Sequence, residues 1–298
     1  MKPETLAKIA VAYSGFVWGL FWIPVRALDG AGVHGLWSSM VFYAIPGLLV
    51  LPILALRWRQ HLAGGRWLVL LGLATSVPLV CYSIAVLYTD VIRAMLLFYL
   101  TPIWSTILAR LFLKERITPV RHAAIAMAML GILAIFRVDE RLPWPENAGD
   151  WAALVAGFGW AVASVLLRFD RGTHAVEFTV QNFLWSAIAV TIAALAFAAG
   201  PPPSLHLVAA QLWWLVPTLI AVVMTGVYAA LWGAPKLSPG LVGLLFMTEI
   251  SVGSITAALW SGDPFGPREI VGIVLISLAG ILESAIDLTR GARPATNR

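Results

Sequence analysis

Long apolar stretches follow one another along almost the whole chain, with only short polar breaks between them. Each is about 18 residues or longer, which is enough for a helix to cross a hydrocarbon core of about 30 Å. No room remains for a separate soluble domain, so we expect an all-α integral membrane protein. The pattern predicts about ten transmembrane helices, at residues 5–27, 34–56, 67–88, 91–112, 119–136, 149–168, 177–199, 209–232, 240–260 and 267–287.

The composition agrees with this pattern. Hydrophobic residues make up 60% of the chain and charged residues 12%, against about 45–50% and about 25% in an average soluble domain. The net charge of +5 comes from basic residues scattered over short loops, which argues against nucleic acid as a partner. The single cysteine, Cys81, lies inside an apolar stretch and permits no internal disulfide. We expect no cofactor and no metal.

The basic residues predict the orientation in the membrane. With a cytoplasmic N-terminus, the inner segments would hold 15 of the 20 Lys and Arg residues and the outer segments only 5. The positive-inside rule therefore favours both termini in the cytoplasm, which for a bacterial chain means the cell inner membrane.

The two halves of the sequence echo each other. Residues 83–118 align with residues 231–266 at a constant offset, as Glu115 with Asp263 shows (263 − 115 = 148), and Trp18 corresponds to Trp160. This indicates duplication of a five-helix unit, with repeats at 1–141 and 142–298. Because five is odd, the second repeat enters the bilayer from the opposite side. Two inverted repeats around a central cavity are typical of secondary transporters that work by alternating access.

Several of these segments resemble a known family. They are "AVLYT" (85–89), "LLFYLTPIWSTILARLFLKERIT" (96–118), "GILAI" (131–135) and, in the second half, "LFMTEISVGSITAALWSGDPFGPREIVGIVLISLAGILES" (245–284). They are similar to the EamA-type members of the drug/metabolite transporter superfamily, which implies a ten-helix transporter that acts as an exporter. Among these, the aromatic residues described below favour the YddG-type exporters of aromatic amino acids. One departure is that Ile250, beside Glu249, replaces the proline that the first half has at Pro102.

Proline and glycine mark the helices that we expect to bend. Proline removes one backbone hydrogen bond and kinks a helix, and glycine allows close packing or bending. Such residues are frequent in all membrane helices, so only their symmetric placement carries weight. The expected hinges, in the third, fourth, eighth and ninth spans, are Pro78, Pro102, Gly226 and Gly253.

Aromatic side chains at central or outer depths predict a cavity with aromatic walls. Ring-on-ring contact adds about 0.5–1.5 kcal/mol beyond area burial, so such walls suit an aromatic solute. Apart from Glu249, no Lys, Arg, Asp or His lies near a predicted midplane, which argues against phosphate-bearing substrates. A substrate carboxylate would then be held by broken-helix amides or by Ser83, Ser164, Asn182, Thr225 or Thr248. The predicted substrate-binding residues are Trp18, Phe21, Trp22, Tyr82, Tyr99, Trp160, Ser164, Phe246, Thr248 and Glu249.

Glu249 has three interpretations. An ionised acid at the bilayer centre costs at least about 2.5–3.5 kcal/mol, so this side chain should be neutral, paired or facing water. It pairs with the ammonium group of a substrate, or takes up and releases a proton during transport, or stays protonated and joins two helices by a hydrogen bond.

The chain is therefore predicted to export small hydrophobic or aromatic metabolites, chiefly aromatic or neutral amino acids, as a monomer, with proton coupling left open. Multidrug or amine export within the same superfamily is the alternative. An enzyme is not expected, because no catalytic constellation of side chains is seen and the five His residues lie near loops or span ends. A channel or structural interaction protein is the rival of another class, although no helix has the polar stripe of a pore.

Overall fold

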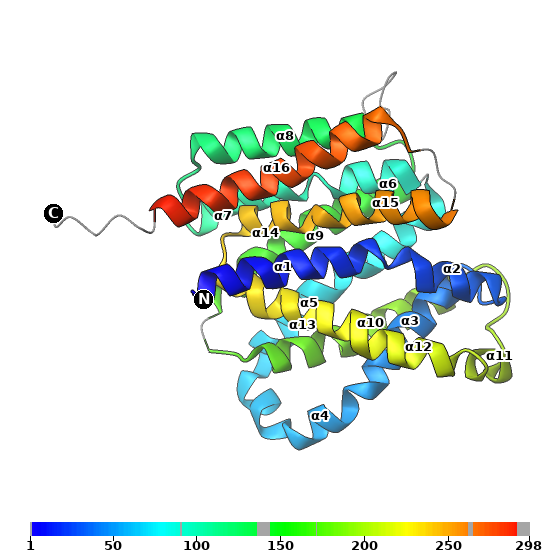
Figure 1. Ribbon diagram of the computed structural model, residues 1–298. Coiled ribbons are helices and arrows are strands. Elements are labelled where there is room, and N and C mark those ends of the chain that lie inside the picture. Colours follow the sequence, from blue (N-terminus) through cyan, green and yellow to red (C-terminus); the bar gives the residue numbers. More distant parts are fainter. Residues whose placement is uncertain (1, 90, 136–143, 171, 262–264, 291–298) are drawn as a thin grey trace.

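The computed structural model describes residues 2–89, 91–135, 144–170, 172–261 and 265–290. Over these residues the secondary structure is entirely helical. The helices run roughly parallel or antiparallel in one bundle, with the start of α1 at one end and α2 at the other (Figure 1). The expected boundary between the repeats, at 141/142, lies outside the described residues.

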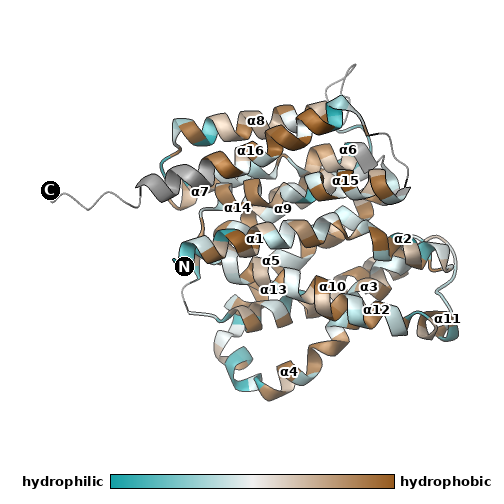
Figure 2. Cartoon of the chain, viewed as in Figure 1, coloured by the Kyte–Doolittle hydropathy of each residue, from teal (hydrophilic) through white to brown (hydrophobic). Residues whose placement is uncertain are grey.

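The helices have the apolar character that membrane spans require. Eight helical segments in the described part of the chain are long and apolar enough to cross a membrane, and α8 is a shorter apolar helix. Hydrophilic residues gather at the ends of the helices and at the elbow between α4 and α5 (Figure 2). The all-helical class is confirmed, whereas the count of ten spans and the position of the termini stay predictions.

The first half of the chain contains eight helices, because three of the five predicted spans are divided. The helices are α1 (Pro3–Gly19), α2 (Trp22–Gly30), α3 (Leu36–Leu49), α4 (Leu51–Leu56), α5 (Trp58–Tyr88), α6 (Val91–Phe98), α7 (Thr101–Phe112) and α8 (Pro119–Ile135). Within α5 the backbone leaves helical geometry at Gly65 (φ 50°), so a short helix precedes the long one.

The second half is divided in a similar way. A π-helical turn, η1, interrupts the eighth span and replaces regular helix just before Gly226. The elements are α9 (Ala148–Phe169), α10 (Ala175–Phe197), α11 (Leu205–Ala209), α12 (Leu212–Thr218), η1 (Leu219–Met224), α13 (Thr225–Gly233), η2 (Ala234–Lys236), α14 (Pro239–Phe246), α15 (Thr248–Ser261) and α16 (Pro267–Arg290).

Two of the helix breaks fall at positions that the offset of 148 pairs. The fourth span breaks after Phe98 and the ninth after Phe246. In the fourth span Pro102 stands in the first turn of α7, where a proline is tolerated but cannot continue a preceding helix. The ninth span has no proline there. Instead, Thr248 Oγ1 donates to the carbonyl oxygens of Leu245 (2.8 Å) and Ala12 (3.2 Å).

Glycines on α1 and α9 allow close crossings at both breaks. A Cβ atom added to Gly15 would lie 2.1 Å from Thr248 Oγ1 and 3.1 Å from the Phe246 carbonyl oxygen. A Cβ atom added to Gly157 would lie 2.4 Å from the Phe98 carbonyl oxygen. The segments "GFVWG" (15–19) and "GFGWA" (157–161) carry these glycines. Each half therefore sends one helix across the broken helix of the other half at a distance that only glycine permits.

The other helix contacts also come in sets that correspond between the two halves of the chain. The helix α8 packs along α16, and α3 packs along α10. The helix α1 contacts α13, α14 and α15, while α9 contacts α5, α6 and α7. In Figure 1, α8 and α16 lie together at the top of the bundle, apart from the larger group of helices that surrounds the centre.

Candidate functional site

A central cavity lies where the broken helices meet. Its walls come from both halves of the chain. The lining residues are Trp18, Phe21, Tyr43, Pro78, Leu79, Tyr82, Ser83, Phe98, Tyr99, Thr101, Trp160, Asn182, Val227, Ala230, Leu231, Gly243, Phe246 and Glu249.

Eight of the 18 lining residues are aromatic, and several of their rings contact one another in pairs. The rings of Trp160 and Phe246 meet edge to face at 5.4 Å, and those of Tyr82 and Phe98 lie 4.8 Å apart. Trp18 packs against Phe21 at 5.4 Å. These are favourable geometries for aromatic pairs, and they fix the shape of an apolar surface that an aromatic solute can contact.

A wider vestibule continues from the central cavity toward one end of the bundle. Both spaces are lined by Trp18, Phe21, Tyr82, Ser83 and Glu249. The vestibule reaches the end of the bundle that carries α2, opposite the start of α1, and its outer residues include Arg26, Asp29, Gly35 and Ser38 (Figure 1). A solute therefore has a path to the cavity from the α2 end.

The opposite end of the bundle is closely packed. A Cβ atom added to Gly240 of α14 would lie 2.5 Å from Thr106 Oγ1 and 3.2 Å from Arg121 Nη1. Arg168 Nη1 donates to the Pro235 carbonyl oxygen at 2.9 Å and so joins α9 to η2. The packing of Gly240 holds the two halves together on the side away from the vestibule, and the Arg168 bond ties two elements of the second half.

Glu249 stands at the junction of the cavity and the vestibule, in the first turn of α15. The phenols of Tyr43, Tyr82 and Tyr99 line the same central cavity. No Lys, Arg or His occurs among the described residues that line the central cavity. The cavity thus combines aromatic walls with one acidic group and no basic group.

Seven of the ten predicted substrate-binding residues line the central cavity. Trp22 lies in the vestibule instead, and its Nε1 donates to Thr256 Oγ1 at 3.1 Å. Ser164 and Thr248 line neither space. Ser164 Oγ donates to the Trp160 carbonyl oxygen and Thr248 Oγ1 to the Leu245 carbonyl oxygen. The seven cavity residues are Trp18, Phe21, Tyr82, Tyr99, Trp160, Phe246 and Glu249.

The four expected hinges lie at or beside the cavity. Pro78 lines the cavity within α5, and Pro102 begins α7 against Gly243, whose added Cβ would lie 3.0 Å from Pro102 Cα. Gly226 follows the π-helical turn and packs against Val17, while Gly253 lines the vestibule. Whether these residues act as hinges stays a prediction.

Sequence reasoning missed several lining residues. Tyr43 of α3 had no signal beyond its aromatic type, and Thr101 had none in the sequence. Phe98 of α6 had one, because the offset of 148 pairs it with the predicted Phe246. Asn182 and Ser83 were weighed only as carboxylate ligands, and both line the cavity. Thr225, weighed with them, bonds Tyr13 instead, at 2.8 Å between the two hydroxyls.

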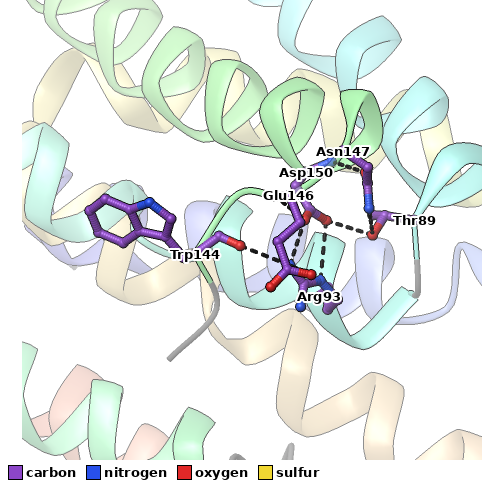
Figure 3. A network of polar contacts seen from close by, with 6 residues as sticks. All are labelled: Thr89, Arg93, Trp144, Glu146, Asn147 and Asp150. Carbon is purple, nitrogen blue, oxygen red and sulfur yellow. Dashed lines mark hydrogen bonds and ion pairs between the residues drawn. The ribbon is translucent and has the colours of Figure 1, made fainter. Parts of the chain in front are cut away.

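A polar network joins the start of α9 to the loop before α6 (Figure 3). Asp150, fully buried, accepts from Arg93 Nη2 at 2.6 Å and from Thr89 Oγ1 at 2.5 Å. Asn147 caps α9 by accepting from the Asp150 backbone N–H at 2.9 Å. Arg93 Nη2 also donates to the Trp144 carbonyl oxygen at 2.8 Å. The network therefore ties the two halves together at the vestibule end.

The described residues contain no group of three or more His, Cys, Asp or Glu side chains that could hold a metal ion. The His residues instead make separate polar contacts, such as His34 Nδ1 with Asp29 Oδ1 at 2.8 Å and His61 Nδ1 with Gln181 Nε2 at 3.2 Å.

Comparison with known protein families finds a match for the first half of the chain. Residues 5–137 match the EamA-like transporter family. The predicted resemblance to EamA-type members of the drug/metabolite transporter superfamily is thereby confirmed over those residues.

Relatives extend the likeness over the second half. The chain is 27% identical to the chloramphenicol-sensitive protein RarD of Pseudomonas aeruginosa, over 91% of this chain and 89% of that protein. It is 23% identical to the uncharacterized transporter YyaM of Bacillus subtilis, over 69% and 68%. A protein named heme A synthase, from Rhizorhabdus wittichii, is 27% identical over 86% and 74%. The names point mainly to transport.

A solved crystal structure supports the fold. It superposes with a TM-score of 0.71 at 17% identity and covers 94% of this chain and 96% of its own. The architecture is therefore one that an experimental structure already contains.

Proposed function

We propose that the chain is an EamA-like transporter along its whole length, built from two inverted five-helix repeats. The packing supports this, because exchanging the halves turns the α1 contacts into the α9 contacts and leaves the pairs α8 with α16 and α3 with α10 in place. The paired breaks after Phe98 and Phe246 support it too. Such symmetry gives one bundle two nearly equivalent packings, which alternating access requires.

The proposed activity is secondary transport across the cell inner membrane. With cytoplasmic termini, the vestibule at the α2 end would face outward, and the packing of Gly240 and Arg168 would close the inner side. Bending of the third, fourth, eighth and ninth spans near Pro78, Pro102, Gly226 and Gly253 would exchange this arrangement for an inward-open one.

The substrates we propose are aromatic or neutral amino acids. The observation that carries this is the central cavity itself, with its aromatic walls, one carboxylate and no basic side chain among the described lining residues. Phosphate-bearing solutes do not suit it. Specificity for aromatic amino acids, as in the YddG-type exporters that the sequence favoured, is part of this proposal.

The position of Glu249 favours its functional interpretations. Its side chain lines both the cavity and the vestibule, where a substrate ammonium group or a proton can reach it. A helix-locking acid would instead be expected between helices and away from the path. Pairing with the ammonium group is the interpretation that the surrounding rings favour, because cations also interact well with aromatic faces.

Export of aromatic amines or drugs is the second candidate. The acidic cavity without a base favours it, and the name of the relative RarD keeps small drugs among the candidates. We do not propose an enzyme: the names of most relatives refer to transport, although one is a heme A synthase. Haem absorbance in the purified protein would contradict this view.

Reconstitution separates these functions. Purified protein in liposomes preloaded with unlabelled tryptophan should accumulate labelled tryptophan by counterflow that saturates with concentration. Phenylalanine and tyrosine should compete. Unsaturable ion conductance without counterflow would instead indicate a channel, and the absence of both would refute the transport proposal.

A further inference from the structure

The polar side chains that line the central cavity differ in whether they can donate a hydrogen bond to a ligand. Ser83 Oγ donates to the Leu79 carbonyl oxygen at 3.0 Å, and Thr101 Oγ1 donates to the carbonyl oxygens of Phe98 (2.5 Å) and Gly157 (3.2 Å). A hydroxyl has a single hydrogen, so these two groups can offer a ligand only lone pairs. Together with the Glu249 carboxylate, they make one part of the cavity an acceptor surface.

Asn182 is different, because it holds an unused donor. This residue lies within α10, its side chain is 2% exposed, and it lines the cavity. Its Nδ2 atom is buried and has no hydrogen-bond partner among the described residues. A buried amide donor without a partner is costly, and the cavity is the side from which a partner can come.

We propose that the Asn182 amide binds the carboxyl group of the transported molecule while Glu249 binds its ammonium group. The inference rests on the proposed function and deepens it, because it names the substrate as an α-amino acid and not an amine. The cavity has no basic side chain among its described lining residues, so a carboxylate there depends on neutral donors.

Selectivity follows from the same geometry. A site built to bond a polar group rejects an analogue that lacks the group, because its own buried donor is then left without a partner. An aromatic amine without a carboxyl group would leave Asn182 Nδ2 unpaired. The wild-type protein should therefore prefer tryptophan to tryptamine by about tenfold or more, the size expected for hydrogen bonds to a charged group.

The test combines the removal of a ligand group with the removal of the donor. Unlabelled tryptophan and tryptamine compete against labelled tryptophan in counterflow by the wild type, Asn182→Leu and Ser186→Ala. Ser186 is the matched control, because it lies one helical turn away on α10, is fully buried with an unpartnered Oγ, and lines neither the cavity nor the vestibule. Asn182→Leu should weaken the apparent affinity for tryptophan about tenfold and keep that for tryptamine within about twofold of the wild type. Ser186→Ala should change neither affinity.

A second variant keeps the test decisive if Asn182→Leu does not fold. Asn182→Asp has the same shape and adds a negative charge, so it should weaken tryptophan further and strengthen tryptamine. Equal changes for both ligands, or a wild type that prefers tryptamine, would overturn the assignment of Asn182 while leaving the transport proposal standing. If the wild type exchanges neither compound, the proposed function and this inference fail together.

Discussion

The crossing of α9 over the break between α6 and α7 depends on a glycine, and this makes Gly157→Ala an informative change. A methyl group there would lie 2.4 Å from the Phe98 carbonyl oxygen and 3.1 Å from Thr101 Oγ1. Because ordinary contact begins at 3.4 Å, the backbone at the break must move by about 1 Å, and dense packing resists such a shift. Overpacking of this kind costs about 1–3 kcal/mol.

Within a helix, alanine is also more favourable than glycine by about 1 kcal/mol. The control must therefore be the same substitution at a position where the new methyl group meets no neighbour. Gly280→Ala in α16 does so, because no atom lies within 4 Å of its added Cβ. Thermal unfolding in detergent should place Gly157→Ala several degrees below Gly280→Ala, at about 2–4 °C for each kcal/mol. If Gly157→Ala unfolds at the same temperature as Gly280→Ala or above it, the close crossing does not exist.

Three further changes test other parts of the account. Gly253→Ala meets no atom closer than Gly19 O at 3.7 Å, so it should keep its unfolding temperature and lower the counterflow rate; an unchanged rate would exclude a hinge at Gly253. Asp150→Asn should lower the free energy of unfolding by about 3 kcal/mol because it breaks a buried ion pair with Arg93, whereas the exposed Asp29→Asn should change it by less than about 0.5 kcal/mol; equal effects of the two would contradict the network. Glu249→Gln should weaken tryptophan about tenfold or more if it binds the ammonium group and should abolish the pH dependence of transport if it carries a proton; no change in either would leave only the helix-locking interpretation.

The apolar pattern predicted the helices well, because the need to bury every backbone group in lipid leaves few alternatives to a helix. It did not predict the breaks after Gly19 and Phe246. The break after Phe246 comes from tertiary contacts, such as the Thr248 hydroxyl against the Ala12 carbonyl oxygen, which no local pattern records. Prolines in the first turn of the following helix were local signals for two breaks, Pro102 for the one after Phe98 and Pro24 for the one after Gly19.

The candidate site was also predicted only in part from the sequence. Trp18, Trp160 and Phe246 were predicted from their depth in the spans, and all three line the cavity. Ser164 and Thr248 have suitable chemistry and depth, yet their helices turn them away from the cavity. Which face of a helix meets a cavity depends on how the bundle packs, and a uniformly apolar helix does not specify it.

The central claim is that the cavity between the two halves is the transport site. The most direct measurement compares tryptophan counterflow in liposomes by two variants of α9, Trp160→Ala and Trp151→Ala. Trp160 lines the cavity against Phe246, whereas Trp151 is 60% exposed on the outside of the bundle. The account predicts that Trp160→Ala weakens tryptophan by about tenfold, from lost stacking and burial, and that Trp151→Ala matches the wild type. Equal counterflow by both variants would contradict it.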